Sequence, residues 1–350
     1  NVGLDFALLK NRLSGTIEYY ISNTNDLLQN VSLPVTAGVL SYTANVGKTQ
    51  NKGVEVSLNG TILNNVNGWS LQAGVNVYAN RNKIVSLASG ATQDINNGWF
   101  VGYNVDAIFD YKRIGLWTSA KDSADNHENI LQPGGHVGMI KALYTGDYNN
   151  GVPTRAIGPA DRQVMNVDPD FEGCVNTRLS YKEFDFDIVG VFRSGGVLIS
   201  TLNGPYSYLN LESGRRNNIK IDYWTPTNTG AKYPRPGKDI SGDNPIYAST
   251  LSYFNGSYLK FRAMSLGYSF LNNKWNWMRK ASINNLRVYF TVQNPFVLFS
   301  DLHKEMGIDP ETNSFGNQNV ATGGYQSRLL TVGFNTPSTR NYVVGITMTL

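Results

Sequence analysis

Apolar and polar residues alternate with a period of two in one segment after another of this chain. Residues 69–78, 286–293 and 342–350 place an apolar side chain at almost every second position, with polar or small residues between. Successive side chains of a strand point to opposite faces, so the pattern predicts strands with one apolar and one polar face. Residues 2–8 and 54–59 alternate in the same way, and the period is weaker in residues 13–21, 175–181, 184–193, 258–270 and 328–334. We therefore expect an all-β chain of about ten antiparallel strands.

Short and long connections alternate between these segments. Short turns are expected at residues 10–12, 64–68, 182–183 and 335–341. Long polar loops are expected at about 23–42, 89–169, 195–255 and 300–326. Loops of this length are uncommon inside compact domains. Bacterial outer-membrane barrels have this rhythm, with short periplasmic turns and long extracellular loops.

The pattern predicts a transmembrane antiparallel β-barrel. No window approaches the roughly 18 consecutive apolar residues that a membrane-spanning helix needs. Strands can cross hydrocarbon only when a closed sheet pairs every backbone group, so the apolar face would meet the lipid bilayer and the polar face a lumen. Alternation is already under way at Val2, and we expect other residues to complete the wall.

Composition excludes several other classes. The net charge is +4, without the clustered basic stripe of a nucleic-acid-binding protein, so no nucleic-acid partner is expected. The single cysteine, Cys174, cannot form an internal disulfide and is interpreted as strand packing. The histidines are scattered without the spacing of a zinc site, and we expect no metal and no cofactor.

Short sequence motifs typical of one protein family lie along almost the whole chain. The most specific are NVG at residues 45–47 and NKGVE at 51–55. Others lie at 1–6, 12–15, 25–28, 101–103, 111–112, 115–117, 161–162, 258–261, 266–268, 293–296 and 309–311. Together they resemble the SusC-like (SusC/RagA) subset of TonB-dependent outer-membrane transporters from Bacteroidetes.

The resemblance implies that residues 1–350 are the C-terminal part of a barrel of about 22 strands, with a plug domain upstream filling its lumen. It implies a bacterial outer-membrane importer of oligosaccharides or oligopeptides, not an enzyme. The implied partners are the rest of the barrel with its plug, a SusD-like surface lipoprotein as lid, and TonB, reached through the N-terminal part. The family often carries an Asp-x-Asn-x-Asp-Gly element before Asp161, but residues 146–151 lack one carboxylate, which argues against calcium there.

Aromatic residues in two long loops are the candidate ligand-binding residues. They are Trp99, Tyr103, Tyr111, Trp117, Tyr206, Tyr208, Tyr223, Trp224 and Tyr247. Flat rings that carry hydrogen-bonding groups suit sugar rings or peptide side chains. The same rings could instead pack the loops together or contact the lid.

The last strand is a candidate assembly strand. Its apolar side is formed by Tyr342, Val344, Ile346, Met348 and Leu350. The resemblance implies that the barrel assembly machinery reads such an alternating terminal strand.

The residues alone are also compatible with two other functions. A soluble secreted β-sandwich that binds glycans would also show alternating strands. A glycan-cleaving enzyme would need an acid and base pair, for which Asp168 and Asp170 are the nearest candidates, but no nucleophile motif accompanies them.

Overall fold

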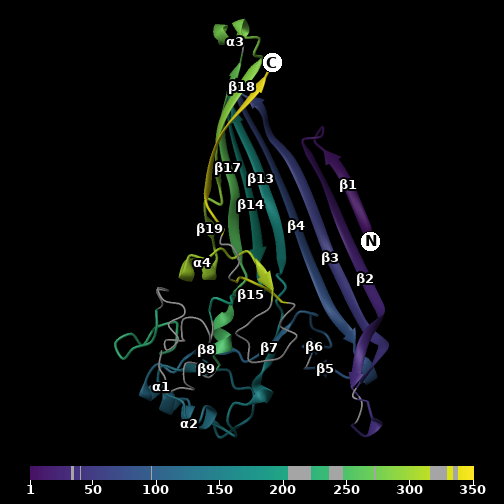
Figure 1. Ribbon diagram of the computed structural model, residues 1–350, viewed down its shortest axis with the longest axis vertical. Coiled ribbons are helices and arrows are strands. Elements are labelled where there is room, and N and C mark those ends of the chain that lie inside the picture. The colour runs from purple at the N-terminus through teal and green to yellow at the C-terminus, as the bar shows by residue number, and fades with distance from the viewer. Residues whose placement is uncertain are drawn as a thin grey trace.

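A computed structural model describes residues 1–32, 35–39, 41–95, 97–203, 222–235, 247–271, 273–315, 329–333 and 338–350. One antiparallel sheet dominates the molecule (Figure 1). Its neighbouring strands are, in order, β1 (Val2–Leu8), β2 (Leu13–Ser32), β3 (Ser41–Val66), β4 (Trp69–Ser86), β13 (Phe171–Tyr181), β14 (Phe184–Ser194), β17 (Tyr258–Leu271), β18 (Asn285–Gln293) and β22 (Asn341–Thr349). The all-β antiparallel prediction is confirmed.

The two ends of the sheet differ as most of the connection lengths predicted. The predicted short turn at residues 335–341 is the exception, because its described residues 338–340 belong to the long connection between the last two strands of the sheet. Short turns, among them the one that carries helix α3 (Asn276–Lys280), gather at the end where the chain finishes, and the long loops gather at the opposite end (Figure 1). Within the described ranges, no helix has the length and apolar character needed to cross a lipid bilayer.

One of the predicted strands is wrong. The tenth strand of the sheet is β19 (Val297–Leu298), which pairs with β17, and residues 329–333, the described part of the predicted strand 328–334, do not contribute one. Instead β21 (Leu330–Thr331) pairs with β20 (Ser314–Phe315) in a separate two-stranded sheet, and β18 pairs directly with β22. Alternation predicts a strand with one buried and one exposed face, and a short strand packed within a long loop has the same pattern.

The predicted loop over residues 23–42 is mostly a hairpin. β2 and β3 extend through this region, and the 3-10 turn η1 (Val35–Ala37) lies between them. Their pairing shifts between Thr24 and Leu28, where Asp26 has a φ of 58°. A spanning strand needs roughly 9 to 11 residues, so these longer strands continue beyond a bilayer, where no apolar face is required. The polar composition of the segment follows from that.

Strand register joins the apolar side chains into continuous rows on one face. Leu266 of β17 faces Phe290 of β18, which faces Val344 of β22. A neighbouring row joins Phe184, Tyr268, Val288 and Ile346. Ile346 is 68% exposed, so the described residues place no second protein layer over this face. The β-sandwich alternative therefore fails, because a sandwich buries such a face against another sheet.

A β-bulge keeps this face apolar along β17. Val189 pairs with Ala263, but the next residue, Gly190, pairs with Phe261, so Arg262 is the extra residue. Leu259 and Phe261 before it, and Met264 and Leu266 after it, consequently share one face. In the sequence of this strand the apolar residues change from odd positions, Leu259 and Phe261, to even positions, Met264 and Leu266. The bulge explains this change.

A contact on the opposite, polar face explains why the NKGVE motif contains a glycine, Gly53. Tyr20 of β2 crosses Gly53 of β3 and donates a hydrogen bond to Asn80 of β4, with an O–O distance of 3.1 Å. A Cβ at position 53 would lie 2.6 Å from the Tyr20 ring. A residue without a side chain is therefore required beneath the ring.

The long loops contain most of the remaining elements. The first holds η2 (Ala88–Gly90), β5 (Gln93–Asp94), β6 (Trp99–Phe100), β7 (Ile108–Asp110), β8 (Arg113–Leu116), α1 (Ala120–Asp125), α2 (Glu128–Leu131), β9 (Ile140–Ala142), β10 (Tyr148–Asn149), β11 (Val152–Pro153), η3 (Pro159–Asp161) and β12 (Gln163–Met165). The second holds β15 (Val197–Ile199), η4 (Ala248–Ser252) and β16 (Tyr253–Asn255), and the third holds α4 (Asp301–Met306), β20 and β21.

Candidate functional site in the long loops and on the polar face

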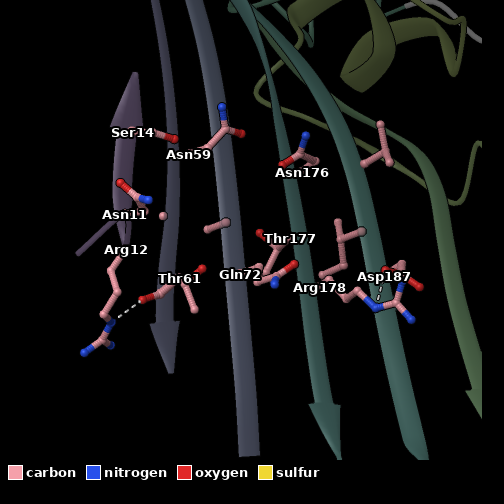
Figure 2. A pocket seen from close by; sticks show the side chains of 14 residues that line it. Asn11, Arg12, Ser14, Asn59, Thr61, Gln72, Asn176, Thr177, Arg178 and Asp187 are labelled. Atoms are coloured by element: carbon pink, nitrogen blue, oxygen red, sulfur yellow. Dashed lines mark hydrogen bonds and ion pairs between the residues drawn. The ribbon is translucent and has the colours of Figure 1, made fainter. Parts of the chain in front are cut away.

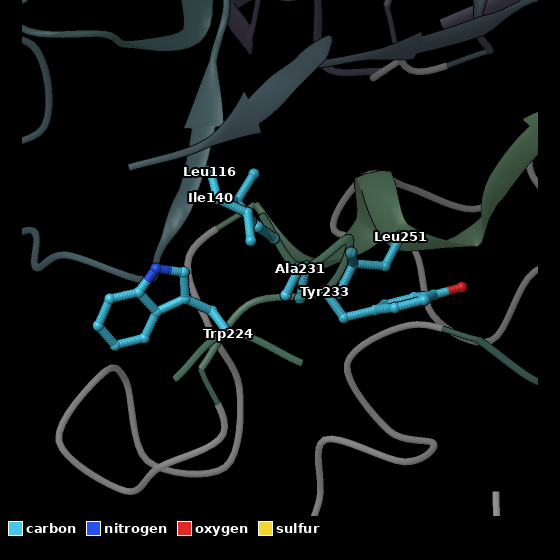
Figure 3. Close-up of a cluster of buried hydrophobic side chains, with 7 residues drawn as sticks. Leu116, Ile140, Trp224, Ala231, Tyr233 and Leu251 are labelled. Atoms are coloured by element: carbon cyan, nitrogen blue, oxygen red, sulfur yellow. The ribbon is translucent and has the colours of Figure 1, made fainter. Parts of the chain in front are cut away.

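The three long loops pack into one body, here called the loop domain, made of the described residues within 87–170, 195–257 and 294–340. Leu116 and Ile140 of the first loop pack with Trp224 and Leu251 of the second (Figure 3). Ile108, Ile199 and Leu329 join all three loops in another cluster. The first loop also has a cluster of its own, formed by Trp117, Leu131, Met139 and Tyr144. Shared and internal clusters together hold a defined surface at this end of the sheet.

Asp161 is a polar hub of the loop domain. Its fully buried carboxylate accepts hydrogen bonds from Arg155 Nη1 at 2.5 Å, from Gly158 N at 2.8 Å and from Thr145 N at 2.8 Å. Burial acts to raise the pKa of Asp161, but these hydrogen bonds outweigh it and hold the pKa well below its ordinary value. The carboxylate therefore stays ionised and ties together residues 145–161 of the first loop.

Two of the predicted ligand-binding aromatics lie inside the loop domain. Trp117 is fully buried, donates from Nε1 to Gln132 Oε1 at 3.1 Å, and carries Lys141 Nζ at 4.3 Å from its ring centroid. Trp224 is buried as well and donates from Nε1 to the carbonyl oxygen of Thr118 at 3.1 Å. In this conformation both rings stabilise the loops.

Other predicted aromatics remain partly accessible. Tyr111 and Tyr247 meet edge to face, with ring centroids 4.7 Å apart, and the Arg162 guanidinium lies 5.3 Å from the Tyr111 ring. Tyr103 and Tyr223 are exposed. Trp99 lines an apolar groove of about 280 Å³. The other two candidates, Tyr206 and Tyr208, lie outside the described residues.

The groove at Trp99 joins the loop domain to the extended hairpin of β2 and β3. Its walls are Leu27, Leu28, Gly47, Lys48, Thr49, Ile84, Ser86, Leu87, Trp99 and Val105. The predicted loop over residues 23–42 thus contributes Leu27 and Leu28 as part of a strand.

Sequence reasoning missed a polar row across the sheet near the loop domain. Tyr78 of β4 donates to Glu172 of β13 at 2.6 Å, and Arg193 of β14 lies 3.5 Å from the same carboxylate. Strand pairing extends the row to Glu55 of β3 on one side and Tyr258 of β17 on the other. Alternation did indicate the polar face, but strand register decides which polar residues are neighbours.

Two of the motifs on which the family resemblance rests, at residues 258–261 and 309–311, meet in an ion-pair cluster. Lys260 Nζ, almost fully buried, lies 2.5 Å from Asp309 Oδ2 and 2.6 Å from Glu311 Oε2, and Arg262 Nη2 lies 2.5 Å from Glu311 Oε1. Burial acts to raise the pKa of Asp309, and hydrogen bonds led by the one from Lys260 bring it below its ordinary value. The cluster ties the loop after α4 to the polar face of β17.

Nearer the short turns, the polar face forms an open hollow of about 390 Å³ (Figure 2). Amide, hydroxyl and charged side chains surround it, including Asn59, Gln72 and Asn176. Arg178 and Asp187 form an ion pair there at 3.8 Å. Such a lining suits water and polar solutes and would be costly against lipid.

The segment expected to lack calcium is a tight hairpin. β10 and β11 are joined by Asn150 and Gly151, both with positive φ, which is the favoured two-residue turn. Over the ranges that the structure describes, no group of His, Cys, Asp and Glu side chains gathers as a metal site would require.

The two carboxylates considered for catalysis have separate structural partners. Asp168 accepts a hydrogen bond from Asn104, and burial raises its pKa. Asp170 pairs with Arg81 at 3.0 Å.

Comparison with known proteins agrees with this architecture. The chain is 30% identical over 357 residues to TonB-dependent receptor P3 of Formosa agariphila, covering 96% of this chain and 33% of that protein. It is 28% identical over 322 residues to TonB-dependent receptor SusC of Bacteroides thetaiotaomicron, covering 90% of this chain and 29% of that protein. A solved structure of the RagAB peptide importer in its open-open state shares the fold, with a TM-score of 0.67 and 23% sequence identity. The match covers 99% of this chain and 34% of that chain. No family model matches the chain.

The uncovered apolar face, polar opposite face and loop domain define part of the barrel of an outer-membrane TonB-dependent receptor. Within that class, the chain belongs to the SusC/RagA-like receptors and spans about a third of the length of the relatives it matches. The apolar face is accordingly the lipid face, and the polar face is the lumen face. The family is non-enzymatic, which confirms the expectation for catalysis.

Proposed function

We propose that this chain forms wall and ligand-facing loops of an importer that takes up oligosaccharides or oligopeptides across the outer membrane. The observation that carries the proposal is the packing of the loop domain over a charged lumen face. The buried clusters give the loops a defined shape, and the row around Glu172 and Arg193 lies where β13 and β14 enter these loops. A solute captured at the loops would meet this polar surface next.

Oligopeptides are the first ligand class to test. The solved RagAB structures with this fold are of a peptide importer. The Glu172 and Arg193 pair and the Lys260 cluster offer charges of both signs, as the termini and side chains of a peptide do. Exposed rings such as Tyr103 and Tyr223 would serve either class by stacking on sugars or side chains.

The partners of the complete receptor belong to the same proposal. A SusD-like surface lipoprotein would close over the loop domain, and TonB would energise release through a plug held by the rest of the barrel. The RagAB complexes support the lid. Copurification of a lipoprotein with the tagged full-length receptor tests it.

Uptake by whole cells tests the transport proposal. Cells lacking the full-length receptor would be compared with complemented cells for entry of labelled oligopeptide and oligosaccharide pools. We expect the receptor to restore entry of one pool, and a protonophore to abolish that entry. Unchanged entry of both pools without the receptor would contradict the proposal.

Single tyrosines then test the loops. Tyr103→Ala and Tyr223→Ala should each weaken ligand binding by about 1 kcal/mol, as expected for the loss of one stacked ring. Tyr148→Ala is the matched control, because Tyr148 is a similarly exposed tyrosine on the separate β10–β11 hairpin. Equal effects of all three changes would argue against a specific role for the first two rings.

A further inference from the structure

The short-turn end of the sheet carries a strong excess of positive charge. Its turns contain Lys10, Arg12, Lys182, Lys274, Arg279 and Lys280, against the carboxylate of Glu183. Lys274 forms an ion pair with that carboxylate. The side chains of Lys182, Arg279 and Lys280 are exposed. An uncompensated cationic surface therefore remains around α3.

An aromatic column on the lipid face leads into this surface. Phe184 and Tyr268 meet with ring centroids 4.7 Å apart, Tyr268 and Phe270 at 4.7 Å, and Phe270 and Trp275 at 5.6 Å. Phe184 and Tyr268 belong to the apolar row that ends at Ile346. Trp275 consequently stands where the lipid face ends, and Trp277 is exposed close by in the chain.

The turn that holds these side chains is anchored. Met278 is fully buried, and its carbonyl oxygen accepts a hydrogen bond from Ile283 N at 2.9 Å. The Trp277 carbonyl oxygen accepts from Ala281 N at 3.1 Å. Figure 1 shows α3 standing beyond the end of the sheet. Arg279 and Lys280 thus project from a held turn, next to aromatic rings at the edge of the lipid face.

We propose that this α3 patch, formed by Lys182, Trp275, Trp277, Arg279 and Lys280, binds the anionic headgroups of phospholipids in the periplasmic leaflet. Short turns face the periplasm in outer-membrane barrels. Indole rings favour the interface between acyl chains and headgroups, and each cation near an anionic membrane surface contributes attraction to phosphate. The proposal rests on the outer-membrane location and orientation of the barrel and is independent of the transported ligand.

Lipid retention by the purified full-length receptor tests the proposal. Delipidated receptor in detergent would be titrated with dioleoylphosphatidylglycerol or with dioleoylphosphatidylcholine, and bound lipid counted by native mass spectrometry. The double variant Arg279→Gln/Lys280→Gln should bind the anionic lipid about thirtyfold more weakly, given the attraction per cation. Its binding of the zwitterionic lipid should be unchanged. The matched control is Lys112→Gln/Lys121→Gln, which removes equal charge from exposed lysines of the loop domain.

Each other outcome would overturn the proposal. Equal weakening by both double variants would mean that net charge alone attracts the lipid. Equal loss of both lipids would mean that the patch offers apolar contact without headgroup recognition. Unchanged binding of phosphatidylglycerol would show that these cations serve another partner, such as a periplasmic protein or the rest of the receptor.

Discussion

The ring of Tyr289 on β18 lies directly over Gly345 on β22. The two residues are paired across the strands on the lumen face, and a Cβ built at position 345 would lie 2.2 Å from Tyr289 Cζ. The absence of a side chain at Gly345 therefore lets the tyrosine ring lie flat against the neighbouring backbone. Together they couple the last strand to the sheet.

Gly345→Ala should destabilise the barrel by about 1 to 3 kcal/mol, the usual cost of forcing an extra methyl into a packed contact. Urea unfolding of the receptor in detergent measures this. Gly60→Ala is the matched control, because a Cβ there has its nearest neighbour 3.9 Å away. Adding Tyr289→Ala to Gly345→Ala should recover part of the loss, and no recovery would place the strain elsewhere.

Ile346→Asp and Met348→Asp should each prevent assembly of the receptor in the outer membrane. Both side chains lie on the lipid face, where a charge costs up to a few kcal/mol near mid-bilayer. Surface labelling of cells measures the folded receptor. Thr347→Asp is the control, since Thr347 pairs with Arg287 on the lumen face and should be tolerated. Normal surface levels of the first two variants would contradict the orientation of β22.

Asp161→Asn should loosen the first long loop by about 2 kcal/mol, because the hydrogen bonds from Arg155 and Gly158 would lose their charged acceptor. The pKa of Asp161 is lowered in the fold. Its contribution is therefore fully present above the unfolded pKa of about 4 and is lost as pH falls from there through the folded pKa.

Limited proteolysis of the first loop between pH 7 and pH 3 measures both effects. Wild type should become sensitive only at the acidic end of this range, whereas the variant should be sensitive throughout. Asp125→Asn is the control, because Asp125 forms an exposed pair with Lys121. Equal protection of wild type and Asp161→Asn at pH 7 would refute the role of the hub.

Lys260→Met should release the loop after α4 from the lumen face. The change leaves Asp309 and Glu311 without their shared cation, and loss of one partner from a buried ion pair costs about 3 to 5 kcal/mol. Hydrogen exchange over residues 301–315 should accelerate. Lys304→Met, at an exposed position of α4, should leave it unchanged. Slow exchange in the Lys260 variant would mean that Arg262 alone holds the loop.

Much of the candidate site lay outside the reach of sequence reasoning. Trp117 and Tyr103 look alike as loop aromatics, yet one is fully buried and the other exposed. Trp117 is buried against Leu131, Met139 and Tyr144 of the same loop, and that packing depends on how the loop folds back on itself. Tyr206 and Tyr208 remain predictions, and so does the role of the remaining aromatics in ligand binding.

The alternation of residues by itself predicted the main strands and their two faces, because successive side chains of a strand point to opposite sides. That the apolar face meets lipid and not a second sheet was decided by the structure, in which the described residues leave that face uncovered. The tertiary structure decided the hairpin beyond the bilayer, the bulge at Arg262, and the meeting of Lys260 with Asp309 and Glu311. These features depend on register and on long-range packing. Local sequence records which face a side chain prefers, but not which distant residue it will meet there.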